Sequence, residues 1–439
     1  MLKFIEIILA VLLANFFYFP VEFVFLPGIN TKMMLAVVGL LFAAYHLIQK
    51  QQALVIPREL LWMEIIAGTV SLVSLLSITI NHTPDTSYVS YIISFNVWLS
   101  GAYAVCYIIK AIHGRIDTQL VLNYLAAVCV FQCVMAIAID RNPAVMMWVD
   151  RVFSFGQGGL RKLKRIYGIG AALDVAGMRF SAVLAGLGFY LAEIKKPLRP
   201  WPRILYILSF FIIVVIGNMV ARTTLTGAII GLAIIILGLI FKPADESSSS
   251  KSVAVLTWLG LLTLGTAYCV FLYNTDASMR KLFRFAFEGF FSLAEKGYWD
   301  VSSNNKLQTM VVFPETLHTW IIGDGYFLNS RYDINYLGDA TDQGFYMGTD
   351  IGYLRFIFYF GIVGLIPMMC VILYPTVVCM RYFRNDRLLF LLAMLVGLIV
   401  WAKVSTDLFC FFALFLCAAA LQDTPEEEVP NLEPDSSVS

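Results

Sequence analysis

The stretch ILYILSFFIIVVIGNMVARTTLTGAIIGLAIIILGLIF, residues 204–241, decides the fold class of this chain. It is apolar along nearly its whole length and is interrupted by a single charged residue, Arg222. A membrane-spanning helix needs about 20 consecutive apolar residues, so the stretch can form two spans joined by a short connection. The sequence therefore predicts two adjacent transmembrane helices with an arginine between them.

The composition of the whole chain agrees with a bilayer environment. Hydrophobic residues make up 59% and charged residues 14% of the chain, whereas soluble domains carry about 25% charged residues. The mean hydropathy is +0.78. A net charge of +1 suggests no nucleic-acid partner. The eight cysteines are scattered in apolar runs without the spacing of a metal site, so neither a metal nor a cofactor is predicted.

Apolar runs of spanning length recur and predict an all-α polytopic membrane protein with about twelve transmembrane helices. Residues 1–421 form the predicted transmembrane domain, and residues 422–439 form an acidic cytoplasmic tail that is predicted to be disordered. No small-residue cleavage site follows the first run, which predicts a span retained in the mature protein. The runs lie at 3–20, 31–48, 60–80, 88–109, 118–139, 169–192, 203–220, 223–241, 252–273, 351–374, 388–402 and 407–421.

The basic residues of the short loops orient these spans. With the N-terminus in the cytoplasm, the inner loops carry Lys and Arg, while the outer loops at 21–30 and 81–87 carry neither. This asymmetry is typical of a multi-pass protein of the bacterial inner membrane. Two outer segments depart from it, at 141–165 and 274–350. Because positive charge on the outer face opposes the usual topology, both segments are candidates for function.

Residues 274–350 form one long extracytoplasmic loop, on the periplasmic side in this orientation. Between Ser278 and Lys296, apolar residues recur with Arg and Lys between them, which predicts an amphipathic helix on the membrane surface. Phe313-Pro314 is predicted to interrupt regular structure, and Gly323-Asp324-Gly325-Tyr326 is predicted to form a turn.

Arg222 is the sharpest candidate for a functional residue. A charged side chain inside apolar sequence is costly in a bilayer and marks a functional site by default. Thr223, Thr224 and Thr226 can cap the following helix, whose N-terminus favours an anion. The alternative interpretation is an interfacial arginine that extends toward water and ends a span.

Arg165 and Arg179 bracket the beginning of the sixth predicted span. Arg179 lies inside the apolar stretch, shortly after Asp174. The alternative roles are an internal Asp174–Arg179 pair that only positions helices, and a basic patch around Arg165 that touches lipid headgroups.

Three further candidates lie at the end of the long loop. Asp350 and Arg355 stand where the loop meets the tenth span, either as functional groups or as an interfacial salt bridge. His318 precedes the glycine-rich turn and is a candidate supporting residue or a structural histidine. Arginines beside one acid on the outer face suit a diphosphate leaving group, because Arg stays ionised and binds phosphate through two parallel hydrogen bonds. The acid can accept a proton from an attacking hydroxyl.

The order and spacing of these residues resemble the bacterial polysaccharide polymerase and ligase superfamily, which contains Wzy-type O-antigen and capsule polymerases and the O-antigen ligases. The likeness covers roughly residues 160–400. Ligases typically show a His-Asn pair where this chain has Asp350 and Ile351, a departure that favours polymerase. The motifs are Arg165-Ile166-Tyr167-Gly168 with Asp174 and Arg179, Ala221-Arg222-Thr223, Ile321-Ile322-Gly323-Asp324-Gly325-Tyr326, Asp350 to Arg355, and Gly361-Ile362-Val363-Gly364.

The resemblance implies a GT-C-like, metal-independent glycosyltransferase of lipopolysaccharide or capsule biosynthesis, with its active site facing the periplasm. A growing glycan would pass from undecaprenyl diphosphate to a lipid-linked repeat unit, with membrane lipid around both substrates and a chain-length regulator as a candidate partner. Asp350, Arg222 and His318 would be catalytic. Arg165, Arg179, Arg222 and Arg355 would hold the diphosphate.

Two other functions stay open at this point. An O-antigen ligase would use the same residues to transfer the glycan to lipid A core or another acceptor. A lipid-linked glycan transporter or flippase is the second alternative. Transporters tend to show repeats and broken helices near the midplane, whereas here the long loop and the charges gather at the outer surface.

Overall fold

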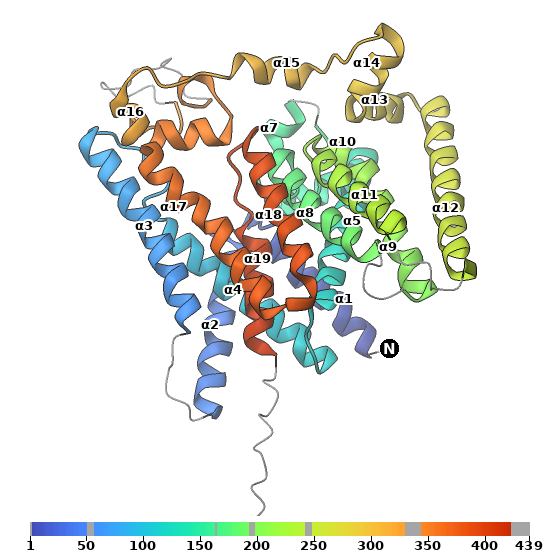
Figure 1. Cartoon of the computed structure of the whole chain (residues 1–439), viewed down its shortest axis with the longest axis horizontal. Coiled ribbons are helices and arrows are strands. Elements are labelled where there is room, and N and C mark those ends of the chain that lie inside the picture. Colours follow the sequence, from blue (N-terminus) through green and yellow to red (C-terminus); the bar gives the residue numbers. More distant parts are fainter. Residues whose placement is uncertain are drawn as a thin grey trace, which may run out of the picture.

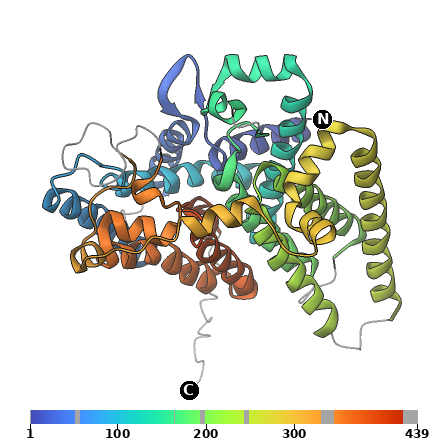
Figure 2. The same ribbon diagram turned by 90° about the horizontal axis from the view of Figure 1, so that it is seen from above.

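The computed structural model describes residues 2–50, 57–162, 165–192, 198–241, 248–329 and 344–422. They form a helical bundle crossed at one end by a chain of short helices (Figure 1, Figure 2). Lys164, in the predicted basic patch around Arg165, lies outside the described residues. Residues 423–439 of the predicted tail also lie outside them. The disorder predicted for the tail therefore stays a prediction.

Each of the twelve apolar runs is largely helical. In lipid, backbone N–H and C=O groups find no water, and a helix pairs them with one another within the run. A π-helical turn, Ile213–Gly217, joins α9 to α10. The α-helices are α1 Leu2–Tyr18, α2 Thr31–Lys50, α3 Arg58–Ile80, α4 Tyr91–His113, α5 Thr118–Arg141, α6 Pro143–Val152, α7 Gln157–Lys162, α8 Leu173–Leu191, α9 Pro200–Ile212, α10 Asn218–Val220, α11 Thr224–Phe241, α12 Ser248–Thr275, α13 Ala277–Ala286, α14 Glu288–Lys296, α15 Ser302–Thr309, α16 Leu317–Ile321, α17 Gly352–Tyr382, α18 Arg387–Trp401 and α19 Phe409–Leu421.

Seven helices of the described residues are long and apolar enough to cross a membrane. They confirm an all-α fold of membrane-protein character, whereas the count of about twelve spans stays a prediction. The seven are Thr31–Ile48, Arg58–Ile80, Tyr91–His113, Thr118–Arg141, Pro200–Val220, Thr224–Phe241 and Gly352–Tyr382.

Helix α11, which follows Arg222, packs mainly against α8. Helix α11 packs along α8 through small residues, and a side chain on Gly227 would lie 2.2 Å from the Cα atom of Ser181. Ser181 Oγ donates to the Thr223 carbonyl and accepts from the Gly227 N–H, at 2.9 and 3.1 Å. Close approach through small residues is the usual way that helices associate in lipid. This packing holds the connection at Arg222 beside the beginning of α8.

A small antiparallel sheet was not predicted from the sequence. Strand β1 (Glu22–Phe23) pairs with β2 (Leu26–Asn30) and with β3 (Phe153–Ser154). The sheet joins the connection after α1 to the connection after α6, and β2 leads directly into α2.

The long loop crosses one end of the bundle as α13, α14, α15 and α16, and we call this end the loop end (Figure 1). The amphipathic segment predicted over 278–296 is helical, but it is broken at Phe287 into α13 and α14. The interruption at Phe313-Pro314 and the turn at Gly323 to Tyr326 are confirmed, since neither is helical and both glycines have positive φ.

Helix α17 is broken near its beginning. Phe360 and Gly361 have non-helical backbone angles, and Gly361 has φ +67° and ψ −170°. A side chain on Gly361 would lie 2.1 Å from the carbonyl oxygen of Ile321, so the break allows α16 to pack directly on the α17 backbone. The segment Gly352–Tyr359, which carries Arg355, is therefore held by the loop end.

Candidate functional site

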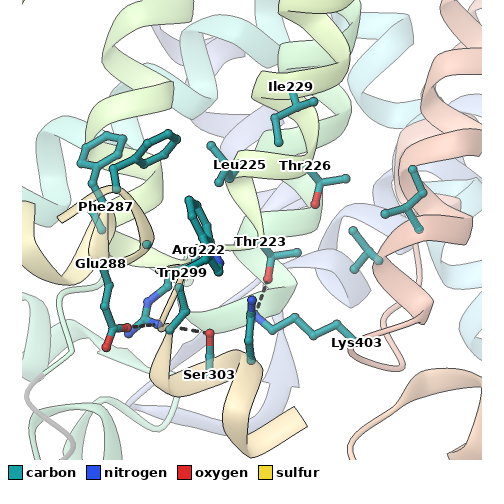
Figure 3. Close-up of a pocket in the computed structure, with 17 residues that line it drawn as sticks. Arg222, Thr223, Leu225, Thr226, Ile229, Phe287, Glu288, Trp299, Ser303 and Lys403 are labelled. Atoms are coloured by element: carbon teal, nitrogen blue, oxygen red, sulfur yellow. Dashed lines mark hydrogen bonds and ion pairs between the residues drawn. The ribbon is translucent and has the colours of Figure 1, made fainter. Parts of the chain in front are cut away.

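Arg222 lies at the loop end, in the non-helical connection between α10 and α11. Its guanidinium is 15% exposed and pairs with Glu288 at 2.5 Å (Figure 3). It also donates to Ser303 Oγ at 3.1 Å. Glu288 and Ser303 come from α14 and α15, so the long loop supplies the polar partners of an arginine that the membrane helices position.

The ring of Phe285 joins Arg222 to Arg165. Each guanidinium lies over this ring, with its central carbon 4.2 Å from the ring centroid. Burial lowers the pKa of both arginines, and the neighbouring charge of Arg165 acts on Arg222 in the same direction. Glu288 opposes the shift in both cases. The structure thus brings together two of the arginines that the sequence singled out, in a partly dry setting that strengthens their attraction for an anion.

Lys403 supplies a third cation to the same place. It lies in the connection between α18 and α19, and its ammonium group donates to Asp174 at 2.8 Å and to Thr223 Oγ1 at 3.0 Å. Thr223 also donates to Asp174. The sequence analysis did not single out Lys403. A lysine in a very short connection between apolar runs was the signal that could have identified it.

These groups line a cavity of about 280 Å³ (Figure 3). Arg222, Thr223 and Lys403 form its polar part, with Glu288 and Ser303 from the long loop. Another wall of the cavity, along α11 and α18, is mainly apolar. That wall consists of Leu225, Ile229, Ile399 and Val400.

The apolar wall continues out of the cavity onto an exposed helical surface. Ile229 and Ile399 are 60% and 43% exposed. Ile229 lies on α11, which is long and apolar enough to cross a membrane, so its exposed side chain faces lipid when α11 lies in a bilayer. The cavity therefore combines a cationic end with a wall that leads toward the lipid-facing surface.

Asp350 and Arg355 form a second group at the loop end. Arg355 is buried between the rings of Phe327 and Phe345, 3.6 and 4.0 Å from their centroids. It donates to Ser405 Oγ at 2.7 Å and lies 3.5 Å from Asp350. The interfacial pair that the sequence allowed is therefore present, but it is clamped by aromatic rings rather than exposed.

Asp350 is the half-buried acid of this second group. Burial raises the pKa of Asp350 to about 6, against the opposing charge of Arg355. The charges of Asp174 and Lys403 also act on this carboxyl group. A carboxyl group with a pKa near 6 is ionised at neutral pH and is well matched to accept a proton.

Arg179 contacts a different set of groups. It is 6% exposed, and its guanidinium lies 5.5 to 5.8 Å from the ring centroids of Tyr18, Phe19 and Trp98. Asp174 pairs with Lys403 and Thr223, so the Asp174–Arg179 pair considered from the sequence does not form. The diphosphate-binding role of Arg179 stays a prediction.

His318 lies on the exposed surface of α16. Within α16, the side chains of Thr319 and Trp320 donate to Asp324 and to the Pro314 carbonyl oxygen, at 2.7 and 2.9 Å. The described contacts do not bring the imidazole to the cavity, and a catalytic role for His318 stays untested.

Glu288, Ser303 and Phe285 were also missed, because polar and aromatic residues are common throughout the long loop and nothing in their spacing marks them.

In comparisons with known proteins, no family model, no curated protein and no solved structure matches this chain.

Proposed function

We propose that this chain is an O-antigen or capsule polysaccharide polymerase that joins lipid-linked repeat units. In this proposal it is a metal-independent, GT-C-like glycosyltransferase with about twelve spans in the bacterial inner membrane. The loop end faces the periplasm, and undecaprenyl-diphosphate-linked glycans reach the cavity from the lipid.

One observation carries the proposal: two cations, Arg222 and Lys403, line a cavity that also has an apolar wall, and Arg165 lies over the same Phe285 ring as Arg222. A diphosphate needs several fixed positive charges, and Arg binds phosphate oxygens through two parallel hydrogen bonds. A polyprenyl chain needs apolar contact. A ligand that joins a diphosphate to a polyprenyl chain fits both parts of the cavity at once.

The proposed reaction is a glycosyl transfer between two lipid-linked glycans. A hydroxyl oxygen of the acceptor sugar attacks the anomeric carbon of the donor glycan and forms the new glycosidic bond. The bond from that carbon to the phosphate oxygen breaks, and its electron pair leaves with undecaprenyl diphosphate. The hydroxyl proton passes to Asp350. Arg222, Arg165 and Lys403 stabilise the charge that grows on the leaving diphosphate.

The Arg222–Glu288 ion pair competes with an anionic ligand for Arg222. Glu288 occupies the position that an anion would take beside Arg222, 2.5 Å away. A diphosphate must displace it, and it does so with more negative charge and more acceptor oxygens. We therefore expect α14 to shift when the substrate binds.

The decisive experiment measures polymer length and ligand binding together. Arg222→Ala is expected to abolish the ladder of long glycan chains on gels and to weaken binding of radiolabelled undecaprenyl diphosphate by the purified protein. Arg151→Ala is the control, because Arg151 is an exposed arginine of α6 that does not line the cavity. Long chains that persist in Arg222→Ala at wild-type expression contradict the site assignment.

A strain lacking the protein separates the alternatives. Loss of the ladder indicates a polymerase. A ladder that forms but remains on the lipid carrier indicates a ligase, and lipid-linked units that accumulate unpolymerised on the cytoplasmic side indicate a flippase.

A further inference from the structure

A second apolar groove lies beside the cavity, where α12 meets α13 and α14. It has a volume of about 420 Å³ and is lined almost entirely by apolar side chains. Cys269, Val270 and Tyr273 line it from α12, and Phe283 and Phe291 line it from the long loop.

The groove and the cavity share a wall. Phe287, at the break between α13 and α14, and Phe290, in α14, line both the groove and the cavity. The two apolar surfaces therefore diverge from one point. One runs along α11 and α18 below the cations, and the other runs along α12.

Helix α12 is placed so that the groove opens to the surrounding lipid. It stands apart from the rest of the bundle and packs mainly against α9 and α13 (Figure 1, Figure 2). Val270 is 53% exposed and lies in the apolar segment Leu259–Thr275 of α12. In a bilayer, lipid acyl chains therefore cover Val270.

We propose that this groove holds the polyprenyl chain of the acceptor substrate, while the wall along α11 and α18 holds that of the donor. The inference rests on the proposed polymerase function, which requires two polyprenyl-linked molecules to be bound at the same time. A single polyprenyl path beside the cations would leave the second chain without a place next to the first.

The position of the groove fits the chemistry of an acceptor. The donor reacts at the carbon attached to its diphosphate, so its diphosphate must lie among the cations near Asp350. The acceptor reacts at the far end of its glycan, so its diphosphate lies one repeat unit away from Asp350. A separate phosphate site is therefore needed beside the groove.

Arg280 of α13 provides a cation beside the groove, because it contacts Tyr273, which lines the groove. Its guanidinium donates to the carbonyl oxygens of Tyr273 and Asn274, both at 2.9 Å, and lies 5.5 Å from the Tyr273 ring centroid. Arginine has five N–H groups in a rigid plane, so these two bonds orient the group and leave others for phosphate oxygens. Lys281, the next residue, is exposed beside it.

The test counts undecaprenyl diphosphate molecules bound to the purified full-length protein in lipid nanodiscs, by native mass spectrometry. Wild type is expected to bind two molecules, and Val270→Trp one. Phe271→Trp is the matched control, since Phe271 is 59% exposed on the same helix and does not line the groove, and it is expected to bind two.

Arg280→Gln provides a second variant that leaves the groove open. We expect it to weaken binding of the second molecule about tenfold, the loss of one charged phosphate contact, and to leave the first unchanged. The affinities come from a titration with radiolabelled undecaprenyl diphosphate.

The outcomes separate this inference from the proposed function. One molecule bound to wild type, and still one bound to Val270→Trp, overturns the acceptor groove alone. No molecule bound to wild type overturns both proposals. Displacement of the second molecule by an equal amount of phosphatidylglycerol identifies an ordinary lipid site and also overturns the acceptor groove.

Discussion

Arg165 and Arg222 lie over the same phenylalanine ring, each with its guanidinium carbon 4.2 Å from the centroid of Phe285. Two like charges repel each other, and burial adds to the cost of keeping both ionised. The negative charge of Glu288 and the π-face of the Phe285 ring offset part of this cost. Two arginines held together in this way are preorganised for a ligand that carries more than one negative charge.

Replacing Phe285 tests whether the ring positions the two arginines. Phe285→Leu removes two cation–π contacts, each worth about 0.5–1 kcal/mol or more when desolvated. We expect the dissociation constant for undecaprenyl diphosphate to rise about tenfold. The same substitution at Phe271, on the exposed face of α12, should leave the constant unchanged. Equal affinities for both variants would contradict the positioning role.

Lys403 is expected to act through its charge in the cavity. Lys403→Met keeps most of the side-chain volume but removes the ammonium group, so polymer length and diphosphate affinity should both fall. Lys403→Arg should restore much of both. Asp174→Asn removes the anion that neutralises Lys403 at 2.8 Å, and should tighten diphosphate binding. Weaker binding by Asp174→Asn would show that Asp174 holds Lys403 in place instead.

The pH dependence of polymerisation is expected to follow Asp350. Its folded-state pKa is raised to about 6 by burial, so the carboxylate that accepts the proton is present above this pH and is lost below it. The rate in vitro should therefore rise with pH through an apparent pKa near 6. Asp350→Asn should have little activity at any pH, and a wild-type rate that is flat between pH 5 and 7 would exclude this role.

Thermal unfolding gives a separate check on the same group. Because burial disfavours the charged form, the folded protein binds this proton more tightly than the unfolded chain does. Asp350 thus costs stability as pH rises from the ordinary value of 3.8 through about 6. Asp350→Asn should melt higher than wild type at pH 7.5, and the difference should shrink as the pH is lowered toward 4.

Arg355 is expected to tune Asp350 from its position between Phe327 and Phe345. The arginine lowers the pKa of Asp350, so Arg355→Gln should move the pH profile of polymerisation to higher pH. Ser405→Ala removes only the hydroxyl that accepts a hydrogen bond at 2.7 Å, keeps the positive charge, and should leave the profile in place. A shift of the same size in both variants would indicate a loss of local structure.

The backbone of Gly361 is expected to be essential for attaching the long loop to α17. Gly361→Ala places a methyl group against the Ile321 carbonyl oxygen and forces a residue with a side chain to adopt φ +67°. We expect a loss of about 3 kcal/mol, seen as a lower melting temperature. Gly260→Ala, in open space on α12, should be neutral or slightly stabilising.

The sequence by itself determined where the apolar helical runs lie. Runs such as 204–241 are apolar over lengths that only helices satisfy in lipid, and this property is local. Arg222, the Gly323 turn and the acid at Asp350 could be located in the same way, because each interrupts a local pattern.

Only the tertiary structure decided which side chains meet. Lys403 lies 180 positions from Thr223 and contacts it because α8, α11 and α18 pack closely through small residues. The same packing separates Arg179 from the cavity although it shares α8 with Asp174, and it brings Phe285 of the long loop between Arg165 and Arg222. Hydropathy reports where a helix runs, but not which face it turns to its neighbours, so the composition of the cavity followed from packing alone.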